Sequence, residues 1–331
     1  MKRLAARFGI DMGQLEPVAE RYPVRISSYY RSLISEPGDP VWRQCVPDPL
    51  ELHDEQLADP LDEERLSPVP GLIHRYPDRV VWLVSAKCAV FCRFCMRKRR
   101  LGQSVPDPCD SRGAVLTYIS QTPSIRDVIL SGGDPLMLPD NELEEVLSGL
   151  RAIPHVEMIR IGSRIPVVLP ERITTALCDM LKKYHPLYIN THFNHPVEIT
   201  PESAAACASL ADAGIPLGNQ TVLLKGVNDD PATMTLLMHR LLSIRVRPYY
   251  LHQMDLVQGT GHFRTSVDCG TRIMKALRGH TSGMANPYYV IDLPGGKGKV
   301  PILPETVERN GSHLSITTYE GDVVVYKDAE L

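Results

Sequence analysis

The chain has 331 residues, of which 43% are hydrophobic and 23% are charged, and its formal net charge is −3. This ordinary composition excludes disorder over most of the chain, and the small negative charge excludes a global positive field that would attract nucleic acid or an anionic membrane. No apolar run approaches the roughly 20 residues of a membrane span. No apolar stretch follows the basic residues in 1–8, so we expect no secretory signal and predict a cytoplasmic protein.

The first part of the chain is predicted to be a helical N-terminal extension (1–74). Residues 25–34 suit a short helix that ends at Pro37 and Gly38. Residues 51–65 are acidic and polar and are interrupted by Pro60, so we expect a surface segment there. The sequence Ser-Pro-Val-Pro-Gly at 67–71 is a rigid connector and marks the expected boundary.

Strands and helices alternate after this connector. Apolar, β-branched runs predict six strands, at 80–84, 127–130, 156–161, 187–191, 218–224 and 247–251. Helical spacing occurs between most of them, at 142–150, 174–184, 202–213 and 232–244. Such alternation implies parallel pairing with right-handed crossovers. The predicted fold is therefore α/β, a partial (β/α)6 TIM-like barrel over 75–295, with its chemistry at the carboxyl ends of the strands.

Three of the eight cysteines follow the first predicted strand: Cys88, Cys92 and Cys95, with the spacing C-x3-C-x2-C. Three thiolates can hold a 4Fe–4S cluster and leave one iron open, whereas an electron-transfer cluster uses four protein ligands. Zinc would need a fourth ligand, and the next histidine, His155, is distant. A buried apolar role is the other alternative, which the surrounding basic residues oppose. The remaining cysteines are expected to be packing or incidental thiols: Cys45, Cys109, Cys178, Cys207 and Cys269.

A second polar group, Gly132-Gly133-Asp134, follows the strand at 127–130. Two glycines permit a close approach of the backbone, and a carboxylate suits an ammonium group. Taken alone, Gly-Gly-Asp indicates only a turn. Because it follows a strand of the same barrel, we expect it to lie near the cysteine loop.

The cysteine loop resembles that of the radical S-adenosylmethionine enzymes, and longer motifs resemble the lysine 2,3-aminomutase family. The resemblance starts near residue 22, and its motifs stand in the family's order at 76–79, 160–164, 190–196, 217–220, 245–250 and 277–283. It implies that S-adenosylmethionine chelates the open iron and that Gly132, Gly133 and Asp134 meet its amine. His192 and Gln220 match positions that line this pocket, although a histidine after a strand is often a satisfied core residue.

The resemblance also implies pyridoxal 5′-phosphate. By motif position Lys299 is its Schiff-base lysine, carried by a C-terminal segment (296–331). Lys297 stands where the family usually has glycine and is a rival candidate. Taken alone, this loop would indicate a flexible basic surface turn. Arg75 and Arg79 match partners of the cofactor phosphate, whose geometry a guanidinium fork fits; otherwise they are ordinary surface arginines.

For the substrate, the resemblance assigns Arg97 to the carboxylate and Asp255 and Asp292 to the distal ammonium of lysine. Two carboxylates select a long cationic side chain by charge, which argues against glutamate and leaves arginine open. Individually, each aspartate is more commonly a cap or turn residue. The basic run 97–100 could instead be a nucleic-acid patch, which the slightly acidic chain does not favour.

Two departures from the longer lysine enzymes bear on this expectation. His252 replaces a common tyrosine, as in shorter relatives that act in β-lysylation of elongation factor P. Those longer enzymes also carry a C-terminal cysteine cluster for structural zinc. Here no cysteine follows Cys269, and Asp230 occupies the matching upstream ligand position, so we expect no such zinc.

The predicted function is therefore an isomerase that converts L-lysine to β-lysine. A related aminomutase, of the elongation factor P type or acting on arginine, is the alternative within enzymes. An iron–sulfur electron carrier or sensor is the alternative of another class, against which three cysteines rather than four argue. The expected partners are a flavodoxin- or ferredoxin-type reductant and further copies of the chain, with no nucleic acid and no membrane.

Overall fold

The computed structural model describes residues 2–100, 111–303, 305–310 and 313–327. Nine of its strands form one sheet whose spatial order follows the chain from β1 to β9. Their bounds are β1 Leu72–Tyr76, β2 Arg79–Ser85, β3 Asp127–Gly132, β4 Met158–Gly162, β5 Leu187–Thr191, β6 Leu217–Leu223, β7 Val246–Gln253, β8 Tyr288–Leu293 and β9 Gly298–Pro301.

The strands from β2 to β8 pair in parallel, and β1 and β9 pair antiparallel at the two ends of the sheet. The prediction of a partial TIM-like barrel is confirmed, and the six predicted strands correspond to β2–β7. β8 adds a seventh parallel strand. The sequence pattern does not reveal β8 because its last residues run directly into Pro294-Gly295-Gly296, whose turn signal dominates.

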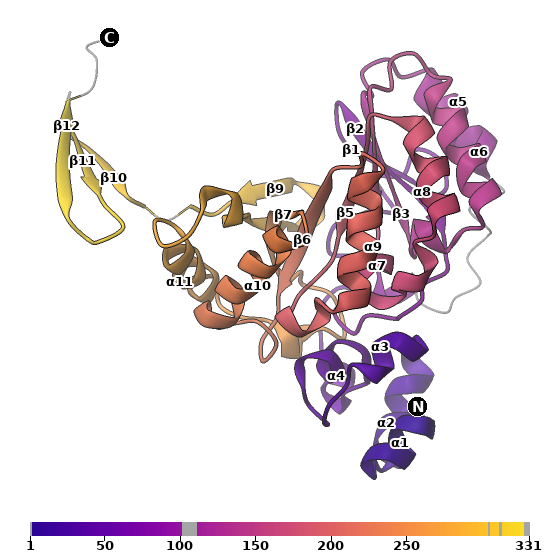
Figure 1. Ribbon diagram of the computed structural model, residues 1–331, viewed down its shortest axis with the longest axis horizontal. Coiled ribbons are helices and arrows are strands. Elements are labelled where there is room, and N and C mark those ends of the chain that lie inside the picture. Colours follow the sequence, from indigo (N-terminus) through magenta and orange to yellow (C-terminus); the bar gives the residue numbers. More distant parts are fainter. Residues whose placement is uncertain (1, 101–110, 304, 311–312, 328–331) are drawn as a thin grey trace.

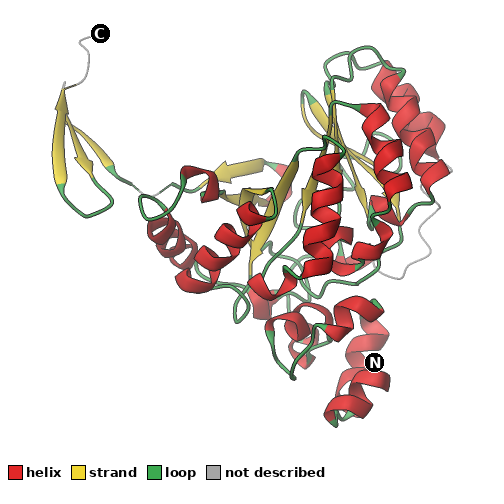
Figure 2. Ribbon diagram, in the orientation of Figure 1, coloured by secondary structure: helices red, strands yellow, loops and turns green. Residues whose placement is uncertain are grey.

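Helices cover the outer face of the sheet (Figure 1 and Figure 2). They are α5 Arg112–Ser120, α6 Asp140–Arg151, α7 Ile165–Val168, α8 Thr175–Leu181, α9 Pro201–Asp212, α10 Pro231–Ser243 and α11 Val267–Leu277. Strand residues such as Val128, Ile159 and Ile189 are fully buried in the core between sheet and helices. Because side chains alternate along a strand, Arg160 and Gln220 point to the opposite face and stay partly exposed in the barrel interior.

The N-terminal extension consists of α1 Lys2–Phe8, α2 Met12–Arg21, α3 Ser28–Ser32 and α4 Pro40–Cys45, and it lies at one end of the barrel (Figure 1). The helix expected at 25–34 is shorter because the Ser27 side chain caps it, accepting from the Tyr30 N–H at 3.0 Å. The proposed boundaries stay predictions; β1 spans the first, after residue 74, and β9 lies in the main sheet beyond the second, after residue 295.

The expectation that residues 51–65 form a surface segment is wrong for two of their carboxylates. Glu51 and Glu63 are buried, and each pairs with basic residues of the cysteine loop. The segment is polar in composition, but these two acids face inward because their oppositely charged partners are buried there. Local composition cannot distinguish such a residue from a solvated one, because its partner lies more than 30 positions away.

A small second sheet follows the barrel and stands apart from it (Figure 1). It consists of β10 Val307–Asn310, β11 His313–Thr317 and β12 Val323–Lys327, all paired antiparallel. Tyr319, in the turn before β12, packs edge-on against His280 of the main body with ring centroids 5.3 Å apart. Within the part of the chain described here, no helix has both the length and the apolar character that crossing a membrane requires.

Candidate functional site

The three cysteines Cys88, Cys92 and Cys95 lie on the loop that leaves β2, and all three are free thiols of intermediate exposure. Burial, followed by the neighbouring Cys92, raises the pKa of Cys95 to about 11. Burial and then Cys95 likewise raise the pKa of Cys88. The thiols are thus close enough to influence one another, and an iron cluster would supply the positive charge that favours their thiolate forms.

Buried cations hold this loop in place. Arg93, between the second and third cysteines, is completely buried and forms a two-pronged pair with Glu51. Lys98 places its ammonium 2.7 Å from Glu51 and also donates to the backbone oxygens of Arg93 and Gly259. The interleaved basic residues are therefore partly core residues, contrary to the argument that they are foreign to a core.

Three cysteines on one loop are too few for a structural zinc site, which uses four protein ligands, whereas they can hold a 4Fe–4S cluster with one iron open. Among residues 2–100, 111–303, 305–310 and 313–327, no three His, Cys, Asp or Glu side chains gather into a metal-ion site. In a four-iron cluster each cysteine binds a different iron, so its sulfurs lie farther apart than the ligands of one zinc ion. Asp230, at the position matching a zinc ligand of longer relatives, instead caps α10 by accepting from Thr233 N–H at 2.9 Å. Cys109 lies outside the described residues.

The glycine pair packs directly against the segment that enters the cysteine loop. A Cβ on Gly132, whose φ is +124°, would lie 2.3 Å from the Ser85 carbonyl oxygen, and one on Gly133 would lie 2.4 Å from that of Lys87. The Asp134 carboxylate accepts from Ser163 Oγ and from the Arg164 N–H, both at 2.7 Å. Burial raises its pKa to about 6. These contacts give the acid an internal structural role; its contact with a cofactor amine stays a prediction.

The two residues matched to the S-adenosylmethionine pocket are His192, which packs beside the cysteine loop, and Gln220 of β6. His192 packs edge-on against Phe94, and its buried Nε2 has no hydrogen-bond partner in the described structure. Burial, then Arg164 and His252, lower the pKa of His192 well below its usual value, so the ring is neutral at pH 7. Gln220 of β6 is partly exposed on the same side. Contact of either side chain with a bound cofactor stays a prediction.

A second group of site residues forms where the two ends of the sheet meet. The Lys299 ammonium lies 2.6 Å from both carboxylate oxygens of Asp292, across the β8–β9 pair. Arg75 of β1 reaches the same carboxylate at 3.5 Å, and His252 Nδ1 lies 3.3 Å from it. Although burial opposes it, the hydrogen bond from His252 and the Lys299 charge hold the pKa of Asp292 well below its usual range.

The two candidate cofactor lysines, Lys299 and Lys297, differ in their surroundings. Lys299 is partly exposed in the interior, and its backbone N–H donates to Tyr76 Oη at 2.8 Å, whereas Lys297 is exposed on the preceding turn. Arg75 also has a buried Nε without a partner in the described ranges, a donor free for a phosphate. Arg79 stacks on Tyr76 with its guanidinium 4.2 Å from the ring centroid. The residues present therefore fit a pyridoxal phosphate site.

Asp255 follows β7 and belongs to the same group. No hydrogen bond or ion pair to its carboxylate occurs in the described part of the chain, although it is partly buried. Burial, followed by the negative charge of Asp292, raises its pKa to about 7. Asp255 is therefore an unsatisfied acid that a cationic ligand would pair with.

Arg97 stands between the cysteine loop and this group. Its guanidinium binds Glu63 through Nη2 at 2.8 Å and Nε at 3.1 Å, and Nη1 donates to Ser131 Oγ at 3.2 Å. Although burial opposes it, the Arg97 charge lowers the pKa of Glu63. A carboxylate thus already occupies the arginine expected to bind the substrate carboxylate. Sequence reasoning missed Glu63, because only its pairing with Arg97 in the folded structure identifies it as a residue of the site.

Comparisons with known proteins agree with this architecture. The model of the radical SAM superfamily matches residues 82–238, and that of "Lysine-2,3-aminomutase" matches residues 274–331. The L-lysine 2,3-aminomutase of Fusobacterium nucleatum is 52% identical, over 94% of this chain and 75% of that protein. The glutamate 2,3-aminomutase of Clostridioides difficile is 47% identical, over 95% and 76%. Streptococcus suis SuiB bound to S-adenosylmethionine shares the fold, with a TM-score of 0.50 at 10% identity, over 66% of this chain and 51% of that one.

The parallel barrel with three cysteines after its first parallel strand is the architecture of a radical S-adenosylmethionine enzyme. Such enzymes use a 4Fe–4S cluster and S-adenosylmethionine. The chain belongs to the lysine 2,3-aminomutase family, whose members are isomerases that also depend on pyridoxal phosphate.

Proposed function

We propose that the protein moves the amino group of L-lysine from Cα to Cβ and so forms β-lysine. The observation that carries this proposal is Asp255, a carboxylate without a partner among the described residues, beside Asp292 and the Lys299 amine. An ammonium group at the end of a long side chain supplies the missing charge. The ionised pair disfavours a substrate with a second carboxylate, such as glutamate, because like charges repel.

The chain's own residues would act as holders and selectors. Cys88, Cys92 and Cys95 would bind the cluster, and Lys299 would hold pyridoxal phosphate, with Arg75 donating to its phosphate. When bound, the cluster with S-adenosylmethionine supplies the hydrogen-abstracting radical, and pyridoxal phosphate makes the amine able to migrate. The partly closed barrel keeps these reactants from bulk water.

Arg97 would bind the substrate carboxylate. Because Glu63 already pairs with it, the substrate would exchange with Glu63 or share the guanidinium through Nη1, which now donates to the neutral Ser131 hydroxyl. An exchange of one carboxylate for another keeps Arg97 paired, and the displaced Glu63 keeps Arg99 as a partner at 3.4 Å, which lowers the cost of opening the pair.

An anaerobic turnover assay tests the function. The reconstituted protein receives S-adenosylmethionine, reductant and pyridoxal phosphate, with lysine, arginine, ornithine and glutamate in parallel. We expect β-lysine and 5′-deoxyadenosine from lysine, and D255N should lose at least tenfold in kcat/KM for lysine by losing the charge pair. Absence of deoxyadenosine with every substrate would contradict the radical enzyme and leave the electron-carrier alternative. Turnover of arginine but not lysine would contradict the assignment of lysine as the substrate. His252, which departs from the longer lysine enzymes, would then be the first position to examine.

A flavodoxin- or ferredoxin-type reductant and assembly into a homo-oligomer complete the proposal. Cluster reduction needs a low-potential one-electron donor. Exposed apolar side chains on the second sheet, including Val323, Val325 and Tyr326, support assembly between copies of the chain. Reduction of the cluster by purified flavodoxin, and sedimentation of the holoenzyme, test these two parts separately.

A further inference from the structure

A buried arginine contacts one of the cluster-loop cysteines. Arg164, which follows β4, donates from Nη1 to Cys92 Sγ at 2.9 Å. Its side chain is only 7% exposed. Its guanidinium lies 5.2 Å from the ring centroid of Phe94, on the same loop. Motif reasoning gave this arginine no role, because its contact with sulfur arises only from the fold.

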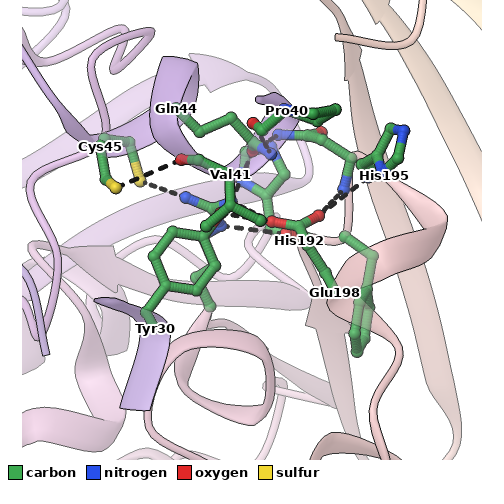
Figure 3. A network of polar contacts seen from close by, with 12 residues as sticks. Tyr30, Pro40, Val41, Gln44, Cys45, His192, His195 and Glu198 are labelled. Carbon is green, nitrogen blue, oxygen red and sulfur yellow. Dashed lines mark hydrogen bonds and ion pairs between the residues drawn. The ribbon is translucent and has the colours of Figure 1, made fainter. Parts of the chain in front are cut away.

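Three elements fix the guanidinium so that its Nη1 faces the sulfur. Nη2 donates to Glu198 Oε1 at 2.7 Å, to Gln44 Oε1 at 2.6 Å and to Tyr30 Oη at 3.0 Å. Nε donates to the His192 backbone oxygen at 3.2 Å. Figure 3 shows Tyr30, Gln44 and Glu198 gathered at this point, with His192 nearby.

The acid that balances the charge of Arg164 is fixed as well. Glu198 is completely buried, and its Oε2 accepts from the N–H groups of Asn194 at 2.6 Å and His195 at 2.9 Å. The Tyr30 hydroxyl donates to Oε1 at 2.6 Å. A charge held on several sides by hydrogen bonds cannot rotate away from Cys92 without leaving buried groups unpaired. The direction of the Arg164 N–H is therefore built into the fold.

We propose that Arg164 is a positioning residue that donates an N–H to the cluster-bound Cys92 sulfur and raises the reduction potential of the cluster. The proposal rests on the proposed role of Cys92 as a ligand. Reduction adds one electron to the cluster, and an N–H donor with a buried positive charge stabilises the more negative state. Hydrogen bonds to cluster sulfurs tune the potential of iron–sulfur proteins in this way.

The same contact makes the N-terminal extension part of the redox site. Tyr30 of α3 and Gln44 of α4 orient an arginine of the barrel, and the Arg93 N–H donates to the Gln44 backbone oxygen at 2.9 Å, between two cluster cysteines. A purely structural role would only attach the extension to the barrel. The two roles differ in one measurable property, the midpoint potential.

A redox titration monitored by electron paramagnetic resonance tests the proposal on the reconstituted full chain without pyridoxal phosphate or lysine. The main variant is R164M with E198Q, which removes the donor and its balancing acid together. R164K keeps a cation but lacks the fork that reaches both Glu198 and Cys92. S203A is the matched control, because the buried Ser203 hydroxyl donates to the backbone oxygen of Glu198 at 2.9 Å and to neither Arg164 nor Cys92.

We expect the double variant to show about a tenfold lower ratio of reduced to oxidised cluster at a fixed solution potential, which is 59 mV for one electron. R164K should shift in the same direction by less, and S203A should keep the wild-type potential. An unchanged potential in a double variant or an R164K protein with full iron content would overturn the proposal. An equal shift in S203A would also overturn it, since that would trace the effect to packing around Glu198.

Failure of the proposed function would look different. If the wild type assembles a cluster but forms no β-lysine, the aminomutase proposal fails, while the potentials still test Arg164. A Cys92→Ala protein that retains wild-type iron content and cluster spectrum would overturn the inference by removing Cys92 from the ligand set.

Discussion

Lys299 and Asp292 face each other across the β8–β9 pair, with the ammonium 2.6 Å from both carboxylate oxygens. The pair holds the ammonium turned into the barrel, so a cofactor that reacts with this amine must first displace an ion pair. Lys297, two residues earlier, is exposed. This relationship makes the choice of cofactor lysine testable.

Borohydride reduction of the protein with pyridoxal phosphate should label Lys299. The K299A variant is expected to lose the pyridoxyl-peptide label, because no other amine lies beside Asp292 in the described structure. The K297A variant should keep it and serves as the matched control. Peptide mapping by mass spectrometry reads the label. A pyridoxyl group on residue 297 of the wild type would contradict the assignment.

The stability of the protein should depend on Asp255 between pH 4 and 7. Burial, then Asp292, raise the pKa of this carboxyl to about 7 in the folded chain, whereas an unfolded aspartate titrates near pH 4. The folded state therefore loses stability from this group as the pH rises, and the whole penalty is present above about pH 7. D255N removes the penalty and should gain on the order of 2 kcal/mol of unfolding free energy at pH 8.

The difference in unfolding free energy between D255N and the wild type isolates this group. Urea unfolding at several pH values should show the difference growing from pH 4 to 7 and then staying constant. A difference that does not vary with pH would contradict the prediction. Lysine binding should show the opposite advantage, tightening in the wild type as the pH rises through 7, because the ionised carboxylate pairs with the substrate ammonium.

Replacing Glu63 should lower the stability of the protein and make Arg97 more accessible to the substrate carboxylate. E63Q leaves Arg97 with an unpaired buried charge and should cost about 3 kcal/mol of unfolding free energy. Lysine supplies a replacement carboxylate, so the rise in melting temperature on adding lysine to the cofactor-loaded protein should be larger in E63Q than in the wild type. E64Q is the control, because Glu64 is exposed beside it. Equal rises in E63Q and the wild type would show that lysine does not reach Arg97.

The glycine pair should tolerate no side chain. An alanine Cβ at residue 132 or 133 would meet backbone oxygens at 2.3 or 2.4 Å, so G132A and G133A should each cost more than about 3 kcal/mol and reduce iron incorporation by displacing the start of the cysteine loop. G113A is the control: nothing lies within 4 Å of its Cβ, and it should be neutral or slightly stabilising. Wild-type melting temperature and iron content in G132A would contradict this prediction.

Much of the barrel follows from local pattern. Runs such as 127–130 and 187–191 are short, apolar and β-branched, and they form β3 and β5 at nearly the predicted bounds. β1 and β9 are end strands with partly polar sequences, so their periodicity is weak. They form because each pairs antiparallel with an adjacent buried strand, which only the assembled sheet provides.

The candidate site likewise contains residues that the sequence predicts and residues that only the fold reveals. The spacing of Cys88 with Cys92 and Cys95 indicates cluster chemistry, whereas the family resemblance assigns the roles of Lys299 and Asp292. Glu63 lies in none of the family motifs, and the motif 160–164 gives Arg164 no role, because each acts through a partner at least 34 positions away. From the sequence alone, Glu63 would be assigned to the solvent-exposed surface, because its partner Arg97 is not evident. Arg164 would likewise be taken as exposed, because its contact with Cys92 is not evident. Charge pairing over long sequence separations is therefore the part of the site that sequence pattern leaves open.

The contact between Tyr76 and Lys299 joins the first strand of the sheet to the last. Lys299, which we propose as the cofactor lysine, thus stands where the two ends of the sheet meet, and Arg75 and Asp292 meet at the same place. During synthesis the ribosome releases this lysine only after all other strands of the sheet have emerged. Under this proposal a partly made or opened barrel would lack a complete site for pyridoxal phosphate, and the visible absorbance of the bound cofactor would report completion of the fold.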